Sequence, residues 1–165
     1  MLDAATPESI AVSLAAGSDV NKAAAGSNKT PLHFAAARGD LGCLTVLLDA
    51  KADVLRFDAD NRCPLALACM NGQGEAAAQL VAATAAKHVA PLLKVPDENR
   101  WTCLHHAVSG GSLQAAAALL HAGAETSAQE RTGRTPFHLA AAVGQERMVE
   151  ALLAAEGGHP QPFPS

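Results

Sequence analysis

The stretch that decides the fold is TPLHFAAARGD, from Thr30 to Asp40, because the chain restates it three more times. Related segments begin at Cys63 (CPLALACMNGQ), Thr102 (TCLHHAVSGGS) and Thr135 (TPFHLAAAVGQ), at offsets of 33, 39 and 33 residues. A glycine follows each start after nine residues, and a pair of apolar residues follows later in the same phase. A fixed internal period of this length is the sequence signature of a repeat protein.

Each part of the repeated segment has a physical reason. Thr30 is a good N-cap, and Pro31 suits the first helical position because its missing N–H would be unpaired there anyway. The alanines that follow keep this inner helix slim, so neighbouring copies can stack. The glycine, Gly39 in the first copy, supplies the left-handed turn that ends the inner helix before a second, outer helix returns. We therefore expect an all-α fold whose helix pairs bury their apolar faces only by stacking.

This pattern resembles the ankyrin repeat, with its 33-residue period and its T-P-L-H-x-A signature. The connectors DADNRCP (residues 58–64) and DENRWTC (residues 97–103) are similar to the D-x-x-G-x-T-P hairpin of that family. The resemblance implies a solenoid of stacked antiparallel helix pairs joined by hairpin loops. It also implies that His33, His105 and His138, which share one position, each bond the capping threonine and the backbone of a neighbouring repeat.

The repeats divide nearly the whole chain. We expect a single domain over residues 1–158, made of a cap (1–24) and repeats at about 25–57, 58–96, 97–129 and 130–158, with a flexible tail at 159–165. The cap helix should start at Thr6 and end near Gly17. In the third connector Arg100 stands where the family has glycine, so we expect that hairpin to differ in shape.

The second repeat departs from the pattern, because six additional residues precede Asp97. We expect its outer helix to continue to about His88 and an extended stretch to follow from Pro91 to Pro96. Two interpretations of this insertion remain open. It is a surface insertion of little cost, or a partner-specific loop that exposes Leu92, Leu93 and Val95.

Composition and charge exclude several classes of protein. The net charge of −4 and the pI of about 5.9 argue against a dedicated nucleic-acid binder. No apolar run of 18 residues is present, so we expect no membrane insertion. The start, MLDAATPES, lacks the features of a secretory signal. The four cysteines lack disulfide-framework spacing, and stacked helices should hold Cys63 and Cys103 too far apart to bridge, so we expect reduced thiols, a cytoplasmic or nuclear location and a monomer.

No catalytic set of residues stands out. Cys103 and His105 diverge around a helix and cannot share a metal, and NGQGEAAA (residues 71–78) follows a helix where a dinucleotide site needs a strand. No Ser/His/Asp set, catalytic carboxylate pair or P-loop is present. We therefore expect a chain that is not an enzyme and that uses no cofactor and no metal.

The resemblance implies that another protein binds the concave face, formed by the hairpin tips and the exposed side of the inner helices. The alternative function is a scaffold or a regulatory or inhibitory subunit of an enzyme complex, docking through residues 82–96 or the outer helices. By register the concave face includes Lys29, Arg38, Phe57, Asp60, Arg62, Met70, Asn71, Glu98, Asn99, Trp101, Ser109, Arg131, Thr132, Arg134 and Val143.

Two features of this face leave alternatives open. Trp101, the only tryptophan, either meets a partner or folds onto the neighbouring hairpin or inner helix. Seven basic and five acidic residues on the hairpins and inner helices give the face a charge of about +2. That surplus suggests a partner segment with acidic residues, although a solvated mixed face accounts for the same count.

Overall fold

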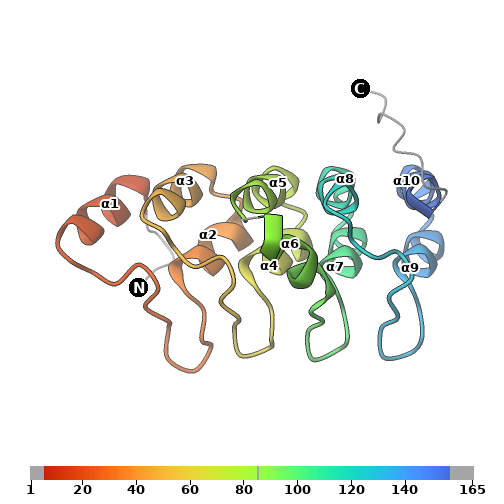
Figure 1. Cartoon of the computed structure of the whole chain (residues 1–165), viewed down its shortest axis with the longest axis horizontal. Helices are drawn as coiled ribbons and strands as arrows, with labels where there is room; N and C mark the ends of the chain where they lie inside the picture. Colours follow the sequence, from red (N-terminus) through yellow and green to blue (C-terminus); the bar gives the residue numbers. More distant parts are fainter. Residues whose placement is uncertain (1–5, 85, 157–165) are drawn as a thin grey trace.

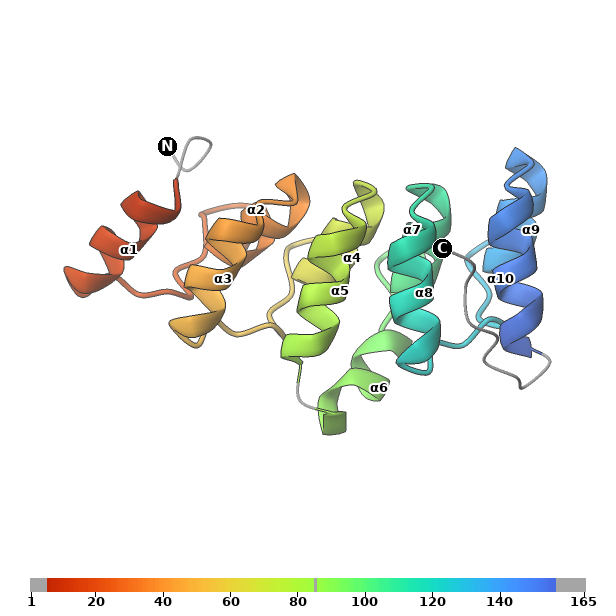
Figure 2. The ribbon, with the colours of Figure 1, turned by 90° about the horizontal axis from the view of Figure 1, so that it is seen from above.

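The helices of the protein form two layers, as seen in a computed structural model that describes residues 6–84 and 86–156 (Figures 1 and 2). Within these residues the chain forms ten helices and no strand. The inner layer holds α2 (Pro31–Arg38), α4 (Pro64–Met70), α7 (Cys103–Ser109) and α9 (Pro136–Val143). The outer layer holds α1 (Pro7–Ala15), α3 (Leu41–Asp49), α5 (Gly74–Ala83), α8 (Leu113–His121) and α10 (Glu146–Glu156). A further helix, α6 (Ala86–Lys94), lies between the second and third repeats.

The local signals in the sequence correctly place the cap helix and the ends of the inner helices. The cap helix α1 begins after Thr6, whose side chain accepts a hydrogen bond from the amide of Ser9, and Gly17 follows it at a φ of +86°. The four glycines that follow the inner helices all have positive φ, which glycine adopts without steric cost. These are Gly39 (+69°), Gly72 (+71°), Gly111 (+69°) and Gly144 (+74°).

Histidines join the first repeat to the second and the third to the fourth, as the resemblance implies for His33 and His105, whereas His138, among the residues that the structure describes, bonds only its own Thr135. The amide of Thr30 donates to Nδ1 of His33 at 3.1 Å, so the ring carries its proton on Nε2, which donates to the carbonyl of Arg62 at 3.1 Å. His105 makes the same bonds to Thr102 and, at 3.3 Å, to the carbonyl of Arg134. Burial lowers the pKa of both histidines, which keeps the rings neutral and able to make these bonds.

The second and third repeats pack against each other with little space at the turn between helices. A Cβ atom added to Gly110 would lie 2.3 Å from the carbonyl oxygen of Cys69, so even alanine is too large there. All four cysteines are buried, and none of them forms a disulfide. The thiols of Cys63 and Cys103 hydrogen-bond each other, which, with burial, raises the pKa of Cys103. The two thiols are therefore neighbours where the second and third repeats pack together.

The expectation for the insertion is wrong in two respects. The outer helix α5 ends at Ala83, where Thr84 turns to extended backbone, and a separate helix, α6, then runs through Pro91 instead of an extended stretch. Leu92 and Leu93 are only 4% and 2% exposed, and Val95 is half-buried, so the insertion does not offer the two leucines to a partner. Burial of the leucines offsets the cost of a proline inside a helix.

The hairpin of Arg100 also differs from expectation, because it keeps the shape of its neighbours. Arg100 has a φ of +63°, close to the +60° of Asn61 in the preceding hairpin. Its amide bonds the carbonyl of Asp97 at 2.9 Å, as the amide of Asn61 bonds that of Asp58 at 3.1 Å. Left-handed backbone costs a side chain of this kind on the order of 1 kcal/mol. The hydrogen bonds of the hairpin offset that cost.

Candidate partner-binding face

Three of the four hairpins are built around buried acidic side chains that sequence reasoning did not single out as supports. We number them hairpin 1 (residues 24–29), hairpin 2 (58–62), hairpin 3 (97–101) and hairpin 4 (130–134). In hairpin 2, Oδ1 of Asp58 accepts from the amides of Asp60 at 3.0 Å and Arg62 at 2.9 Å. In hairpin 3, Oδ1 of Asp97 accepts from the amides of Asn99 at 2.8 Å and Trp101 at 2.9 Å.

Glu130 has the same role in hairpin 4. Its carboxylate accepts from the hydroxyl of Thr132 and from the amide of Arg134, and these bonds lower its pKa. Three of the five acidic residues counted on this face are therefore buried and bonded within their own hairpins. The signal that could have revealed this is an acid five residues before the N-cap of the inner helix in three connectors.

Backbone bonds align the hairpins in a row, visible along the lower edge of Figure 1. The amide of Ala59 donates to the carbonyl of Ser27 at 2.9 Å. The amide of Glu98 donates to the carbonyl of Asp60 at 3.4 Å, and equivalent residues join hairpins 3 and 4 at 3.3 Å. The row therefore has a fixed register, in which equivalent residues of successive hairpins are neighbours.

In the second and third repeats, the residue before the N-cap lies along the inner helix. Nη1 of Arg62 is 3.9 Å from Sδ of Met70, at the end of α4. The ring of Trp101 lies 5.2 Å from that of His106 and 6.0 Å from that of His105, both on α7. The hairpins and the exposed side of the inner helices thus form one surface, which we call the inner face.

Trp101 is half-buried on this face and is held by a small polar cluster. Nε2 of His106 lies 3.1 Å from Oδ2 of Asp97, the same carboxylate that bonds the amide of Trp101. Burial lowers the pKa of His106, so the imidazole is neutral in this contact. The ring of Trp101 therefore packs on the inner helix while part of it stays accessible from the inner face.

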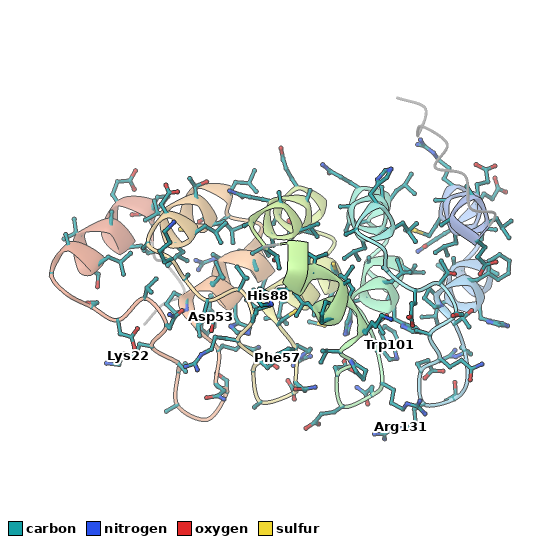
Figure 3. The ribbon with its side chains drawn as sticks, viewed as in Figure 1. Lys22, Asp53, Phe57, His88, Trp101 and Arg131 are labelled. Atoms are coloured by element: carbon teal, nitrogen blue, oxygen red, sulfur yellow. The ribbon has the colours of Figure 1, made fainter. Side chains whose placement is uncertain are left out.

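The predicted face residues fall into two groups along the inner face. One group lies on the hairpins, and Figure 3 shows Arg131 at the tips with Trp101 nearer the helices. The other group lies at the far ends of the inner helices. Lys29, Phe57, Arg62 and Trp101 are half-buried. Phe57 packs against the core and lies beside hairpin 2 in Figure 3. The exposed members are Arg38, Asp60, Met70, Asn71, Glu98, Asn99, Ser109, Arg131, Thr132, Arg134 and Val143.

Exposed apolar side chains mark the inner face as well. In the described part of the chain, four large hydrophobic residues are exposed. Met70 (38% exposed) and Val143 (73%) end the inner helices α4 and α9, whereas Val12 (70%) and Leu153 (50%) lie on outer helices. Among the same residues, no group of three histidine, cysteine or acidic side chains is suited to a metal ion. None of the described helices is long and apolar enough to cross a bilayer.

Comparison with known proteins points to one family. A family model described as "Ankyrin repeats (3 copies)" matches residues 2–91 and 82–161. The chain is 32% identical to "Tyrosine-protein kinase HTK16" of Hydra vulgaris over 75% of its own length and 16% of that protein. It is 35% identical to mouse "NF-kappa-B inhibitor alpha" over 62% of this chain and 32% of the inhibitor. It is 27% identical to "Putative ankyrin repeat protein FPV223" of fowlpox virus over 82% of this chain and 90% of that protein.

Proposed function

Because the chain belongs to the ankyrin-repeat family, whose repeats generally mediate protein–protein interaction, we propose that it is a non-catalytic module that binds a partner protein through the inner face. It spans 16% and 39% of the first two curated relatives and 32% of the mouse inhibitor, so the proposal concerns this repeat array alone. The partner is a different protein, not a second copy of this chain. It is bound by side chains on the helices and hairpins.

The observation that carries the proposal is the combination of exposed apolar and cationic side chains on one rigid surface. Met70 and Val143 are exposed although they are apolar, and the half-buried Trp101 lies on the hairpin between their repeats. Tryptophan and arginine are the residues that most often dominate the energy of protein interfaces. Apolar anchors with a charged surround are what a protein-binding face requires.

The test is affinity capture from lysate with two matched variants. Met70→Glu combined with Val143→Glu places charge on the inner face, and Val12→Glu combined with Leu153→Glu makes the same change on outer helices. We expect the first variant to lose the proteins that the wild type retains and the second to keep them, provided that circular dichroism shows both to be folded. Equal retention by the wild type and the inner-face variant would disprove the proposal.

A second function is favoured by one relative. The mouse protein that matches 62% of this chain is named as an inhibitor of NF-kappa-B, so a regulatory or inhibitory subunit is the alternative. Such a subunit would dock through the outer helices or residues 82–96. Since Leu92 and Leu93 are buried, deleting this segment would disturb the core, and the exposed residues of α6 are the better targets. Loss of a captured partner with His88→Glu and Ala90→Glu, but not with the inner-face variant, would establish this alternative.

A further inference from the structure

Positive charge on the inner face is unevenly distributed between the hairpins. In hairpin 2, Arg62 is already paired, because its Nε lies 3.5 Å from Asp58 and its Nη2 bonds Asp60. Its third guanidinium nitrogen, Nη1, contacts Met70. The guanidinium of hairpin 2 is therefore engaged within its own repeat and has little to offer a partner.

Hairpins 3 and 4 differ, because their acids are mostly turned inward. Asp97 and Glu130 bond the backbone of their hairpins, and only 6% and 4% of their side chains are exposed. Glu98 is the one exposed acid in these two hairpins, which contain three exposed arginines. These arginines are Arg100, Arg131 and Arg134.

Two of the arginines are held in place by hydrogen bonds to hairpins 3 and 4. Nη2 of Arg131 donates to the carbonyl of Glu98 at 2.8 Å, which fixes its guanidinium across hairpin 3. Nε of Arg134 bonds Glu130 at 3.2 Å, while 52% of the Arg134 side chain remains exposed. Pre-positioned guanidinium groups bind carboxylates with less loss of side-chain entropy and often through two hydrogen bonds.

We propose that Trp101, Arg100, Arg131 and Arg134, hereafter the Trp–Arg patch, bind an extended acidic segment of the partner protein. This rests on the proposed function and names the kind of partner. Charge complementarity supports it, since hairpins 3 and 4 carry a surplus of exposed cations beside one half-buried aromatic residue on a chain of net charge −4. The acids of the segment pair with the arginines, and an apolar side chain packs on the indole.

The register of the hairpins also sets the spacing in the partner. Trp101 and Arg134 occupy the same position in successive hairpins, since the amide of each bonds the acid of its own hairpin. A hairpin contains two strand-like segments, so successive hairpins lie about 10 Å apart, and an extended chain advances about 3.3 Å per residue. An apolar residue on Trp101 and an acid on Arg134 are therefore three residues apart in the bound segment.

Trp101 provides its own readout, because the chain contains one tryptophan and no tyrosine. The probe is a 12-residue peptide, acetylated and amidated, of sequence LGSEGSEGSGSG. The matched control, LGSGSGSGSGEE, has the same composition but places both glutamates at the end. We expect the probe to change Trp101 emission with saturation and to bind at least about fivefold more tightly than the control, because only the probe has the required spacing.

Charge-reversal variants and salt show whether the probe binds at the Trp–Arg patch. Arg131→Glu with Arg134→Glu should weaken probe binding by about tenfold or more, whereas Arg147→Glu on the exposed side of α10 should not. Raising NaCl from 50 to 500 mM should weaken binding as well. Equal affinity for probe and control, binding that is unchanged by salt, or tighter binding of a 12-nucleotide oligothymidine would each overturn the proposal.

The capture experiment distinguishes failure of this inference from failure of the proposed function. If a captured partner is lost with Met70→Glu and Val143→Glu but is retained undiminished by the Arg131→Glu and Arg134→Glu variant, the inner face binds and the acidic-segment proposal is wrong. If both variants lose the partner and the spaced peptide competes with it, the proposal is supported. If neither variant loses it, both ideas fail together.

Discussion

Single histidines connect the repeats, and the chain offers its own control for their contribution. His105 is buried, and its Nε2 bonds the carbonyl of Arg134 in the next repeat. We expect His105→Ala to lower the free energy of unfolding by about 2–3 kcal/mol, because it removes the bond between repeats, takes the acceptor from the buried amide of Thr102 and opens a cavity. Urea denaturation monitored by circular dichroism would measure this loss.

His138 is the matched control. It makes the same bonds to Thr135 but is exposed, and within the described residues no later repeat lies beside its Nε2. We expect His138→Ala to cost less than about 1 kcal/mol. If the two substitutions destabilise the chain equally, the bond between repeats contributes nothing and the bond to threonine is the important one.

At the scale of secondary-structure elements, sequence reasoning succeeded where the signal is local and repeated. Threonine caps, the proline after them and the glycines Gly39 and Gly144 fix where the inner helices α2 and α9 begin and end. It failed at α6, because Pro91 and Pro96 suggested extended backbone, while the burial of Leu92 and Leu93 against other helices favours a helix. Burial against distant residues is a tertiary effect that no local pattern contains.

The candidate face, too, could be predicted from the sequence only in part. Register predicted which residues lie on the hairpins and at the ends of the inner helices. It did not predict that Asp58, Asp97 and Glu130 are buried, nor that Arg62 is paired within its own hairpin. These facts depend on side-chain geometry, and they decide where unpaired charge remains.

Two substitutions in helix α6 distinguish a structural insertion from a docking loop. Leu93→Ala should lower the free energy of unfolding by about 2–4 kcal/mol, because the leucine is only 2% exposed. Pro91→Ala should leave stability unchanged or raise it, since Pro91 is exposed and lies inside the helix. Both are measured by urea denaturation. An extended Pro91–Pro96 segment would give the opposite ranking, with the proline important and the leucine dispensable.

At the scale of the whole molecule, buried histidines make stability depend on pH. The pKa values of His33, His105 and His106 are lowered in the folded chain, mainly by burial. Below the ordinary value of 6.5 the unfolded chain therefore binds more protons than the folded one, and the stability present above that pH is lost as pH falls. We expect the melting temperature to be about 5 °C lower at pH 5.5 than at pH 7.5.

Replacing one of these histidines tests the cause. His106→Leu introduces the residue that the second and fourth repeats carry at this position, Leu67 and Leu139. The variant should show a smaller drop in melting temperature between the two pH values. The carboxyl groups with lowered pKa, Asp40 and Glu130, titrate below this range and do not contribute. A wild-type melting temperature that is equal or higher at pH 5.5 would contradict the prediction.

The backbone hydrogen bonds between hairpins all run in one direction, from an amide of each hairpin to a carbonyl of the hairpin before it. Each unit therefore carries one donor for its predecessor and one acceptor for its successor. When such a unit is duplicated in the gene, the new copy brings both halves of the link, and neither neighbour needs a compensating mutation. An array of this kind can gain or lose whole units in a single genetic event, and its binding surface lengthens or shortens by one hairpin each time.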